Sequence, residues 1–197
     1  MLNTDHMIFR KSTAFTLIEL LIVIGVLGIL AAGLLAAVDP FEQLKKARDA
    51  NNRNAVIELH NAYTRYYATH GSLPWDYASA SAACTANLLA FNRGAAQTSL
   101  SVTTLTDCIT DLEGDGELKT GFVSALGGQA DKMFTASPGT TQVFVCFSPE
   151  GKGLWKDTQN KYDSNGIDVS GVGEACETSG AKPASPDTPP SCYWCAK

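Results

Sequence analysis

The stretch AFTLIELLIVI, from Ala14 to Ile24, decides the fold, because it opens a long apolar segment that contains one acidic residue. The segment runs from Phe15 to Val38 and is built almost entirely from Ile, Leu, Val, Ala and Gly. About 20 apolar residues suffice for a helix to cross a bilayer. A carboxylate at mid-bilayer costs roughly 2.5–3.5 kcal/mol, and less near the end of the span. Glu19 therefore calls for a partner or a function.

Three interpretations of this segment compete. A cleaved secretory signal has a basic beginning, an apolar core of about 7–15 residues and a small-residue cleavage site. Arg10, Lys11 and the Ala-rich end at 35–37 fit this pattern in part, but the apolar core is too long and contains Glu19. A plain signal anchor fits the length and leaves the glutamate unexplained. The third interpretation is a family resemblance that rests on residues 14–24.

Residues 14–24 resemble the class III signal of type IV pilins and type II secretion pseudopilins. In that family a prepilin peptidase cuts before the apolar segment, usually between Gly and Phe, and methylates the new N-terminus. The resemblance implies cleavage between Ala14 and Phe15, with Ala14 in place of the usual Gly, and N-methylation of Phe15. It also implies that Glu19 of one subunit neutralises the Phe15 amine of a neighbour and so fixes the register of assembly.

The resemblance also implies where the chain resides and what it meets. The precursor is expected in the inner membrane, and the leader, residues 1–14, is expected in the cytoplasm, an orientation that Arg10 and Lys11 favour under the positive-inside rule. The head is expected outside the cytoplasm, and the mature subunit in an extracellular filament at the cell surface. Expected partners are the prepilin peptidase, identical or related subunits, and the pilus or type II secretion assembly machinery.

The apolar segment, residues 15–38, is predicted to continue as an amphipathic helix over residues 39–70. After Pro40, apolar and aromatic residues recur mostly at three- and four-residue steps, and the sequence GSLP at 71–74 ends the helix. One helix over this length would measure on the order of 80 Å. Its predicted weak points are Gly25, Gly28, Gly33 and Pro40. For the glycines, close helix packing and local unwinding both stay open.

Residues 71–197 are predicted to form a small α+β head with an antiparallel sheet, on which the long N-terminal helix packs as a spine. This part carries 8 Lys and Arg against 14 Asp and Glu, so its bulk charge gives no strong signal for nucleic-acid binding, which normally needs a basic surface. The head is predicted to contain helices at 105–112 and 117–126, strands at 132–136, 142–147, 152–155 and 192–196, and a loop with a short helix at 75–97.

All six cysteines lie in the head, downstream of an export-type segment, which favours disulfides in an oxidising compartment. The tail sequence CYWC at 192–195 admits a redox motif or zinc ligands, but a redox motif normally opens a helix and zinc needs two more paired ligands. Structural disulfides are favoured. In an extended tail, positions three apart lie about 10 Å from each other, too far to bridge, so the two cysteines bond different partners. The predicted pairs, among 15 connectivities, are Cys84–Cys108, Cys146–Cys195 and Cys176–Cys192.

Two acidic turns are candidate calcium sites. The sequence DLEGDGE at 111–117 resembles the first half of an EF-hand loop, but Phe122 stands where the bidentate glutamate belongs. The candidate ligands are Asp111, Glu113 and Asp115 in this turn, and Asp163, Asn165 and Asp168 in a second turn. Solvated turns are the favoured alternative, so no cofactor is expected. No nucleophile–base arrangement or phosphate loop is found, which argues against an enzyme.

The sequence therefore predicts a structural subunit of a type IV pilus-like filament. A type II secretion pseudopilin is the nearest alternative. A membrane-anchored, disulfide-rich ectodomain with binding or hydrolytic activity is an alternative of another class.

Overall fold

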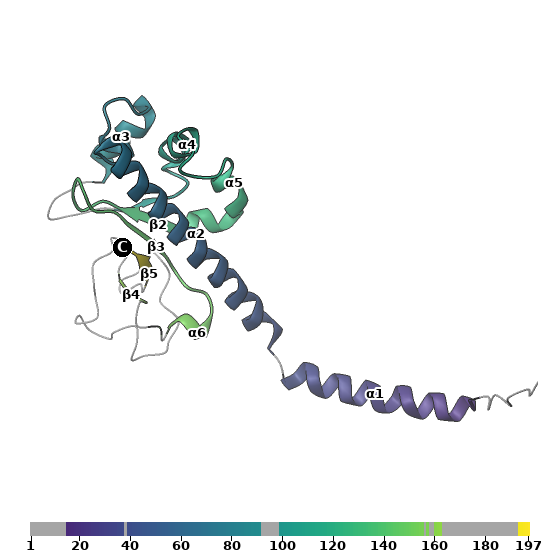
Figure 1. The fold of residues 1–197 in the computed structure, drawn as a ribbon. Helices are drawn as coiled ribbons and strands as arrows, with labels where there is room; N and C mark the ends of the chain where they lie inside the picture. The colour runs from purple at the N-terminus through teal and green to yellow at the C-terminus, as the bar shows by residue number, and fades with distance from the viewer. Residues whose placement is uncertain (1–14, 38, 92–98, 156, 158–159, 163–192) are drawn as a thin grey trace, which may run out of the picture. The chain divides into compact units, whose positions relative to one another are not determined.

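The computed structural model describes residues 15–37, 39–91, 99–155, 157, 160–162 and 193–197. The chain divides into two compact units between Pro40 and Phe41, and each unit is described by itself. The first contains helix α1 (Leu17–Ala37), and the second contains helix α2 (Pro40–His70) from Phe41 onward, the shorter helices and the sheet (Figure 1). An α+β fold with a long apolar N-terminal helix is confirmed.

The structure forms two helices over residues 15–70, and the second begins at Pro40, one of the weak points named from the sequence. Helix α1 is continuous through Gly25, Gly28 and Gly33, and a Cβ added at any of the three would meet nothing within 4 Å. Helix α2 begins at Pro40. Proline suits the first helical position, because its missing N–H would have no partner there in any case. Pro40 therefore starts a second helix and does not bend a single one.

Helix α2 supplies one side of the head's core. Val56, Leu59, Tyr63 and Tyr66 follow each other at three- and four-residue steps and are at most 2% exposed. The helix ends at the predicted position, because Gly71 takes a left-handed conformation with φ 73° and its N–H donates to Tyr67 O at 2.8 Å. The amphipathic pattern of residues 39–70 thus reflects the packing of one face of α2 within the head.

Over the residues that the structure describes, the head contains an antiparallel sheet of five strands. The strands are β1 (Leu100–Ser101), β2 (Met133–Ala136), β3 (Phe144–Phe147), β4 (Asn160–Tyr162) and β5 (Tyr193–Ala196), and their order across the sheet is β1-β2-β3-β5-β4. Strand β5 at the end of the chain therefore lies between β3 and β4. The predicted strands at 132–136, 142–147 and 192–196 are confirmed, each beginning one or two residues later.

Short helices accompany α2 (Figure 1). They are η1 (Pro74–Asp76), α3 (Ala82–Ala90), α4 (Thr106–Gly114), α5 (Phe122–Leu126), η2 (Gly127–Lys132) and α6 (Lys152–Trp155). Of these, α3, α4 and α5 lie near the C-terminal half of α2, and α6 lies near its N-terminal half. The predicted helix at 117–126 is only α5, because Gly121 sits at φ 80° just before Phe122 and prevents an earlier start. The predicted strand at 152–155 is wrong. The chain turns there into α6, where Leu154 N donates to Gly151 O at 3.1 Å.

Trp75 belongs to the core of the head. Its side chain is fully buried, with its ring centroid 5.1 Å from that of Tyr63 on α2 and 4.6 Å from that of Phe91. Its indole N–H donates to Ser137 Oγ at 3.3 Å, just beyond β2. One buried aromatic side chain thereby ties the end of α2 to the sheet.

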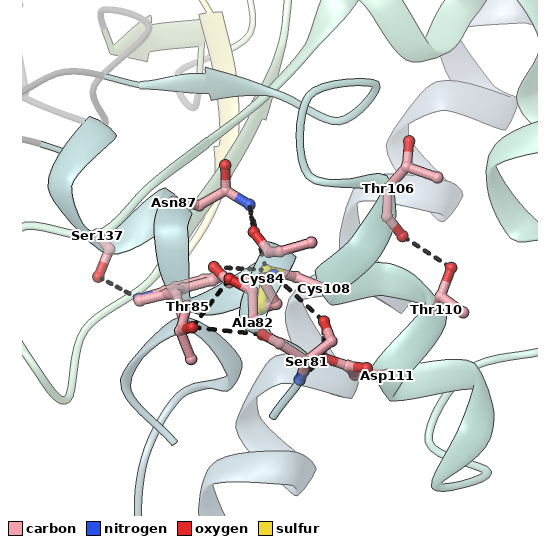
Figure 2. Close-up of a disulfide and its surroundings, with 12 residues drawn as sticks. Ser81, Ala82, Cys84, Thr85, Asn87, Thr106, Cys108, Thr110, Asp111 and Ser137 are labelled. Carbon is pink, nitrogen blue, oxygen red and sulfur yellow. Dashed lines mark hydrogen bonds between the residues drawn. A yellow bond between two sulfur atoms is a disulfide. The ribbon is translucent and has the colours of Figure 1, made fainter. Parts of the chain in front are cut away.

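Two of the three predicted disulfides are confirmed. Cys84–Cys108 joins α3 to α4 (Figure 2), and Cys146–Cys195 joins the paired strands β3 and β5. The predicted third pair, Cys176–Cys192, lies outside the described residues. Because Cys195 bonds Cys146, the CYWC tail forms neither an internal redox pair nor a paired zinc ligand set.

A buried carboxylate fixes the loop before α6 onto α2. Asp49 is 1% exposed, and its Oδ1 and Oδ2 accept the backbone N–H groups of Glu150 at 2.9 Å and Gly151 at 2.7 Å. Burial raises the pKa of Asp49, while these two bonds act to lower it. A Cβ at residue 151 would lie 2.9 Å from Asp49 Oδ2, so this close approach requires glycine. Glu150 also pairs with Arg48 and Lys132.

We expect Asp49→Ala to lower the free energy of unfolding of the head by about 2–4 kcal/mol, because it leaves two buried N–H groups without an acceptor. Asp49→Asn should cost less, since its amide oxygen can still accept one bond. Urea denaturation of the detergent-solubilised chain measures the change. The control is Glu58→Ala, an exposed acid on the same helix, which should stay within about 0.5 kcal/mol of the parent. Equal losses for Asp49→Ala and Glu58→Ala would contradict this role.

Removal of either disulfide should destabilise the head, and removal of Cys146–Cys195 should destabilise it more. The two bonds close loops with sequence separations of 24 and 49 residues. The chain-entropy contributions are about 3 and 4 kcal/mol. The second bond also holds β5, on which β4 depends. Thermal unfolding of the paired alanine variants tests the order. A Cys84→Ala/Cys108→Ala chain that melts below the Cys146→Ala/Cys195→Ala chain would contradict it.

Candidate assembly site

The start of α1 holds a reciprocal hydrogen-bonded cap between Thr16 and Glu19. Glu19 Oε2 accepts the Thr16 backbone N–H at 2.9 Å and the Thr16 hydroxyl at 2.8 Å. In return, the Glu19 backbone N–H donates to Thr16 Oγ1 at 3.3 Å. This arrangement is a capping box, in which the side chains of the cap residue and of the third helical residue satisfy each other's backbone groups.

The role of Thr16 was missed by the sequence analysis, although its signal was present. The pattern Thr16-Leu17-Ile18-Glu19 is the threonine-x-x-glutamate signature of a capping box before an apolar run. Such a cap contributes about 1 kcal/mol, and a carboxylate in the first turn also interacts favourably with the helix dipole. Glu19 therefore has a local function within its own chain.

The cap leaves part of the carboxylate available. Both side-chain bonds end on Oε2, and within the described ranges no bond to Glu19 Oε1 is found. A carboxylate can accept about four hydrogen bonds. Phe15, directly before the cap, is 82% exposed. The site thus presents an unshared carboxylate oxygen beside the residue that the predicted cleavage would make N-terminal. Ala14 lies outside the described residues.

The rest of α1 presents apolar side chains that its own unit leaves exposed. Its large apolar side chains are all at least 49% exposed, and the stretch Leu17–Leu35 is long and apolar enough to cross a membrane. Burying one such side chain is worth about 1.5–3 kcal/mol. The helix therefore needs lipid or other chains around it. These exposed side chains are Leu17, Ile18, Leu20, Leu21, Ile22, Val23, Ile24, Val26, Leu27, Ile29, Leu30, Leu34 and Leu35.

The first acidic turn does not gather its carboxylates into one ligand set. Asp111 Oδ2 accepts from Ser81 N and Oγ at 3.1 and 3.0 Å (Figure 2). Glu113 Oε1 accepts from Phe122 N at 3.0 Å, and Asp115 lies 3.6 Å from a nitrogen of His70. Over the residues that the structure describes, no cluster of three or more His, Cys, Asp or Glu could hold a metal ion.

The second acidic turn, with Asp163, Asn165 and Asp168, lies outside the described residues. The expectation of two solvated turns without a cofactor stays a prediction.

Comparison with known proteins identifies the segment that holds the cap. Residues 9–35 match the family model of the prokaryotic N-terminal methylation motif. Neither a curated protein nor a solved structure matches the chain. The matched residues include Phe15, Thr16, Glu19 and nearly all of α1. The chain therefore carries, over residues 9–35, the class III signal of type IV pilins and pseudopilins.

Proposed function

We propose that this chain is the structural subunit of a type IV pilus-like extracellular filament. The subunit is inserted in the inner membrane, cleaved and N-methylated by a prepilin peptidase, and then polymerised through α1. One observation carries the proposal. Glu19 uses one carboxylate oxygen to cap α1 and leaves the other unshared, at the start of a helix whose large apolar side chains are all exposed. No enzymatic role is proposed.

Because the side chains of α1 are exposed, the helix needs a covering environment twice, first in the membrane and then in the filament. A helix with apolar residues all round is stable only when it is covered all round. Lipid covers it in the precursor, since the stretch Leu17–Leu35 is long enough to span a bilayer. After release from the membrane only other apolar helices can replace lipid, and sister copies of α1 are the matching partners. A filament core of packed α1 helices meets this need.

Pairing between Glu19 and a neighbour's N-terminus gives the filament its register. Cleavage before Phe15 creates a cationic amine one helical turn from Glu19. In the apolar core of a filament either charge alone is expensive, while a hydrogen-bonded pair is tolerated. Glu19 Oε2 stays with Thr16 and Oε1 accepts the amine of the neighbouring copy. The capping box thus holds the carboxylate in position for the second bond.

A pilus is favoured over a secretion pseudopilus by the length of the head and by its disulfides. Two disulfides stabilise the described part of the head, which suits a subunit that remains exposed on the outside of a cell. Isolation of surface filaments and mass spectrometry of their subunits tests the assignment. Absence of the chain from such filaments, together with a protein-secretion defect on deletion, would assign it to a pseudopilus instead.

The mature chain should begin with N-methylated Phe15. Intact-mass and N-terminal sequence analysis of membrane-extracted protein measures this directly. Ala14→Gly, which restores the residue usual in the family, should be processed at least as fast as the parent, and Ala14→Leu should accumulate as precursor because a bulky side chain replaces a small one. An intact leader in the parent, or a start after Ala37, would contradict the proposal and favour a membrane-anchored ectodomain.

Glu19→Gln should lower filament yield more than tenfold, because it removes the charge that pairs with the amine. Breaking a buried ion pair costs about 3–5 kcal/mol. The matched variant is Thr16→Val, which removes the cap hydroxyl and keeps the charge, and which should retain most of the yield. Sheared filaments are quantified by immunoblot against the membrane pool.

The two variants separate pairing from capping. The glutamine oxygen can still accept the Thr16 bonds, so the cap survives in Glu19→Gln. Normal filament yield from Glu19→Gln, with loss of filaments in Thr16→Val, would show that the cap and not the charge is needed. Membrane insertion and folding of the head should be unchanged in both variants.

A further inference from the structure

The acidic turn at residues 111–117 has the residue spacing of a calcium loop but a different set of bonds. In an EF-hand loop the first, third and fifth side chains and the seventh backbone carbonyl bind the ion, and a glycine stands at the sixth position. Gly116 is the sixth residue here, with φ 75°. Each group at a ligand position already lies against a nitrogen of the protein itself. These groups are the side chains of Asp111, Glu113 and Asp115 and the carbonyl of Glu117.

Two of the acids bind the backbone at the starts of neighbouring helices. Asp111 Oδ2 accepts from the N–H of Ser81, directly before α3, at 3.1 Å (Figure 2). Glu113 Oε1 accepts from the N–H of Phe122, the first residue of α5, at 3.0 Å. Such N–H groups lack a partner within their own helix, so a carboxylate oxygen satisfies them. Asp111 and Glu113 lie two positions apart within α4, and side chains at this spacing do not face each other.

The other two ligand groups face side chains from the end of α2. Arg65 Nε donates to Glu117 Oε2 at 2.8 Å, and Arg65 Nη2 donates to the Glu117 carbonyl oxygen. His70 Nε2 lies 3.6 Å from Asp115 Oδ2. The imidazole ring of His70 is held by stacking on Tyr66, with the ring centroids 4.0 Å apart. The guanidinium of Arg65 therefore binds the carbonyl that the seventh position would offer to a metal ion.

The strongest ligand of a calcium loop is replaced by a core residue. The twelfth position normally supplies a bidentate glutamate and here is Phe122. Its side chain is 7% exposed and belongs to the hydrophobic core of the head. Calcium needs about six to eight oxygen ligands. Binding at this turn would therefore break its present bonds without gaining the ligand that contributes most.

We propose that the turn at 111–117 is a metal-free clasp, in which Arg65 and His70 of α2 stand where the residue spacing would place calcium. The two side chains fasten the C-terminal end of α2 to the turn after α4. Asp111 and Glu113 extend the clasp to the starts of α3 and α5. The clasp lies within the head and does not depend on filament formation. The head should therefore need no divalent cation to hold these four helices together.

Thermal unfolding of the full chain in detergent, with calcium or with a chelator, tests whether the turn binds the ion. Calcium sites of extracellular modules have dissociation constants of about 0.1–1 mM. At about 10 mM calcium, an occupied site of this kind would raise the unfolding midpoint by roughly 3–10 °C. We expect equal midpoints in the two conditions at matched ionic strength.

A calcium response of the parent chain is assigned with a variant of the turn. Asp115→Asn removes one candidate ligand of the first turn and leaves the second acidic turn intact. Loss of the response in this variant would place calcium at the first turn and overturn the proposal. A response that persists arises elsewhere in the chain and agrees with the metal-free clasp. The matched control is Asp163→Asn/Asp168→Asn, which removes candidate ligands of the second turn only.

Arg65→Gln should lower the unfolding midpoint by about 2–6 °C, because it removes both bonds to Glu117. The control is Lys119→Gln, which removes an exposed cation two positions after Glu117 and should leave the midpoint unchanged. The losses caused by Arg65→Gln and Glu117→Gln should overlap in the double variant, since the two side chains form one contact.

Two results with these variants would overturn the proposal. One is an equal midpoint for Arg65→Gln and Lys119→Gln. The other is a double variant whose loss is the full sum of the single losses, because independent sites add and paired sites do not. The calcium titration of the parent chain needs no substitution in α2, so it decides the question if Arg65→Gln fails to fold.

Discussion

An apolar helix with no buried face is the constraint on which the rest of this protein depends. Within its own unit, α1 leaves all of its large apolar side chains exposed, so its stability rests on what surrounds it. Lipid and sister helices are the two environments that cover such a surface. The capping box of Thr16 and Glu19 satisfies backbone groups at the start of this helix without neutralising the charge. In the filament that we propose, that residual charge links the apolar surface to ordered assembly.

The head solves a different physical problem, because it must hold together in water with a small core. Helix α2 packs a stripe of aliphatic and aromatic residues inward, and the buried carboxylate of Asp49 fastens the loop before α6 to the same helix. Disulfides reinforce the two places where distant segments meet, α3 with α4 and β3 with β5. The first turns of α2 remain outside this core, and Phe41 and Leu44 are exposed there.

Sequence patterns predicted correctly the elements whose formation depends on residues close together in the chain. The end of α2 at Gly71, the strands at residues 133–136 and 144–147, and the disulfides Cys84–Cys108 and Cys146–Cys195 agree with expectation. The errors also have local causes. Residues 152–155 carry apolar residues without enough length to separate strand from helix. The helix predicted at 117–126 contains Gly121 at a positive φ, which a periodicity of apolar residues does not reveal.

By itself, the sequence determined the apolar helix, the position of Glu19 within it and the disulfide-held α+β head, because composition, periodicity and cysteine spacing are local properties of the chain. Only the tertiary structure decided which segments of the chain contact each other. It placed β5 between β3 and β4, set Asp49 against the backbone of residues 150 and 151, and assigned α2 to the head. These contacts join residues about 30 to 100 positions apart, and their energy depends on burial that arises only when the whole core forms.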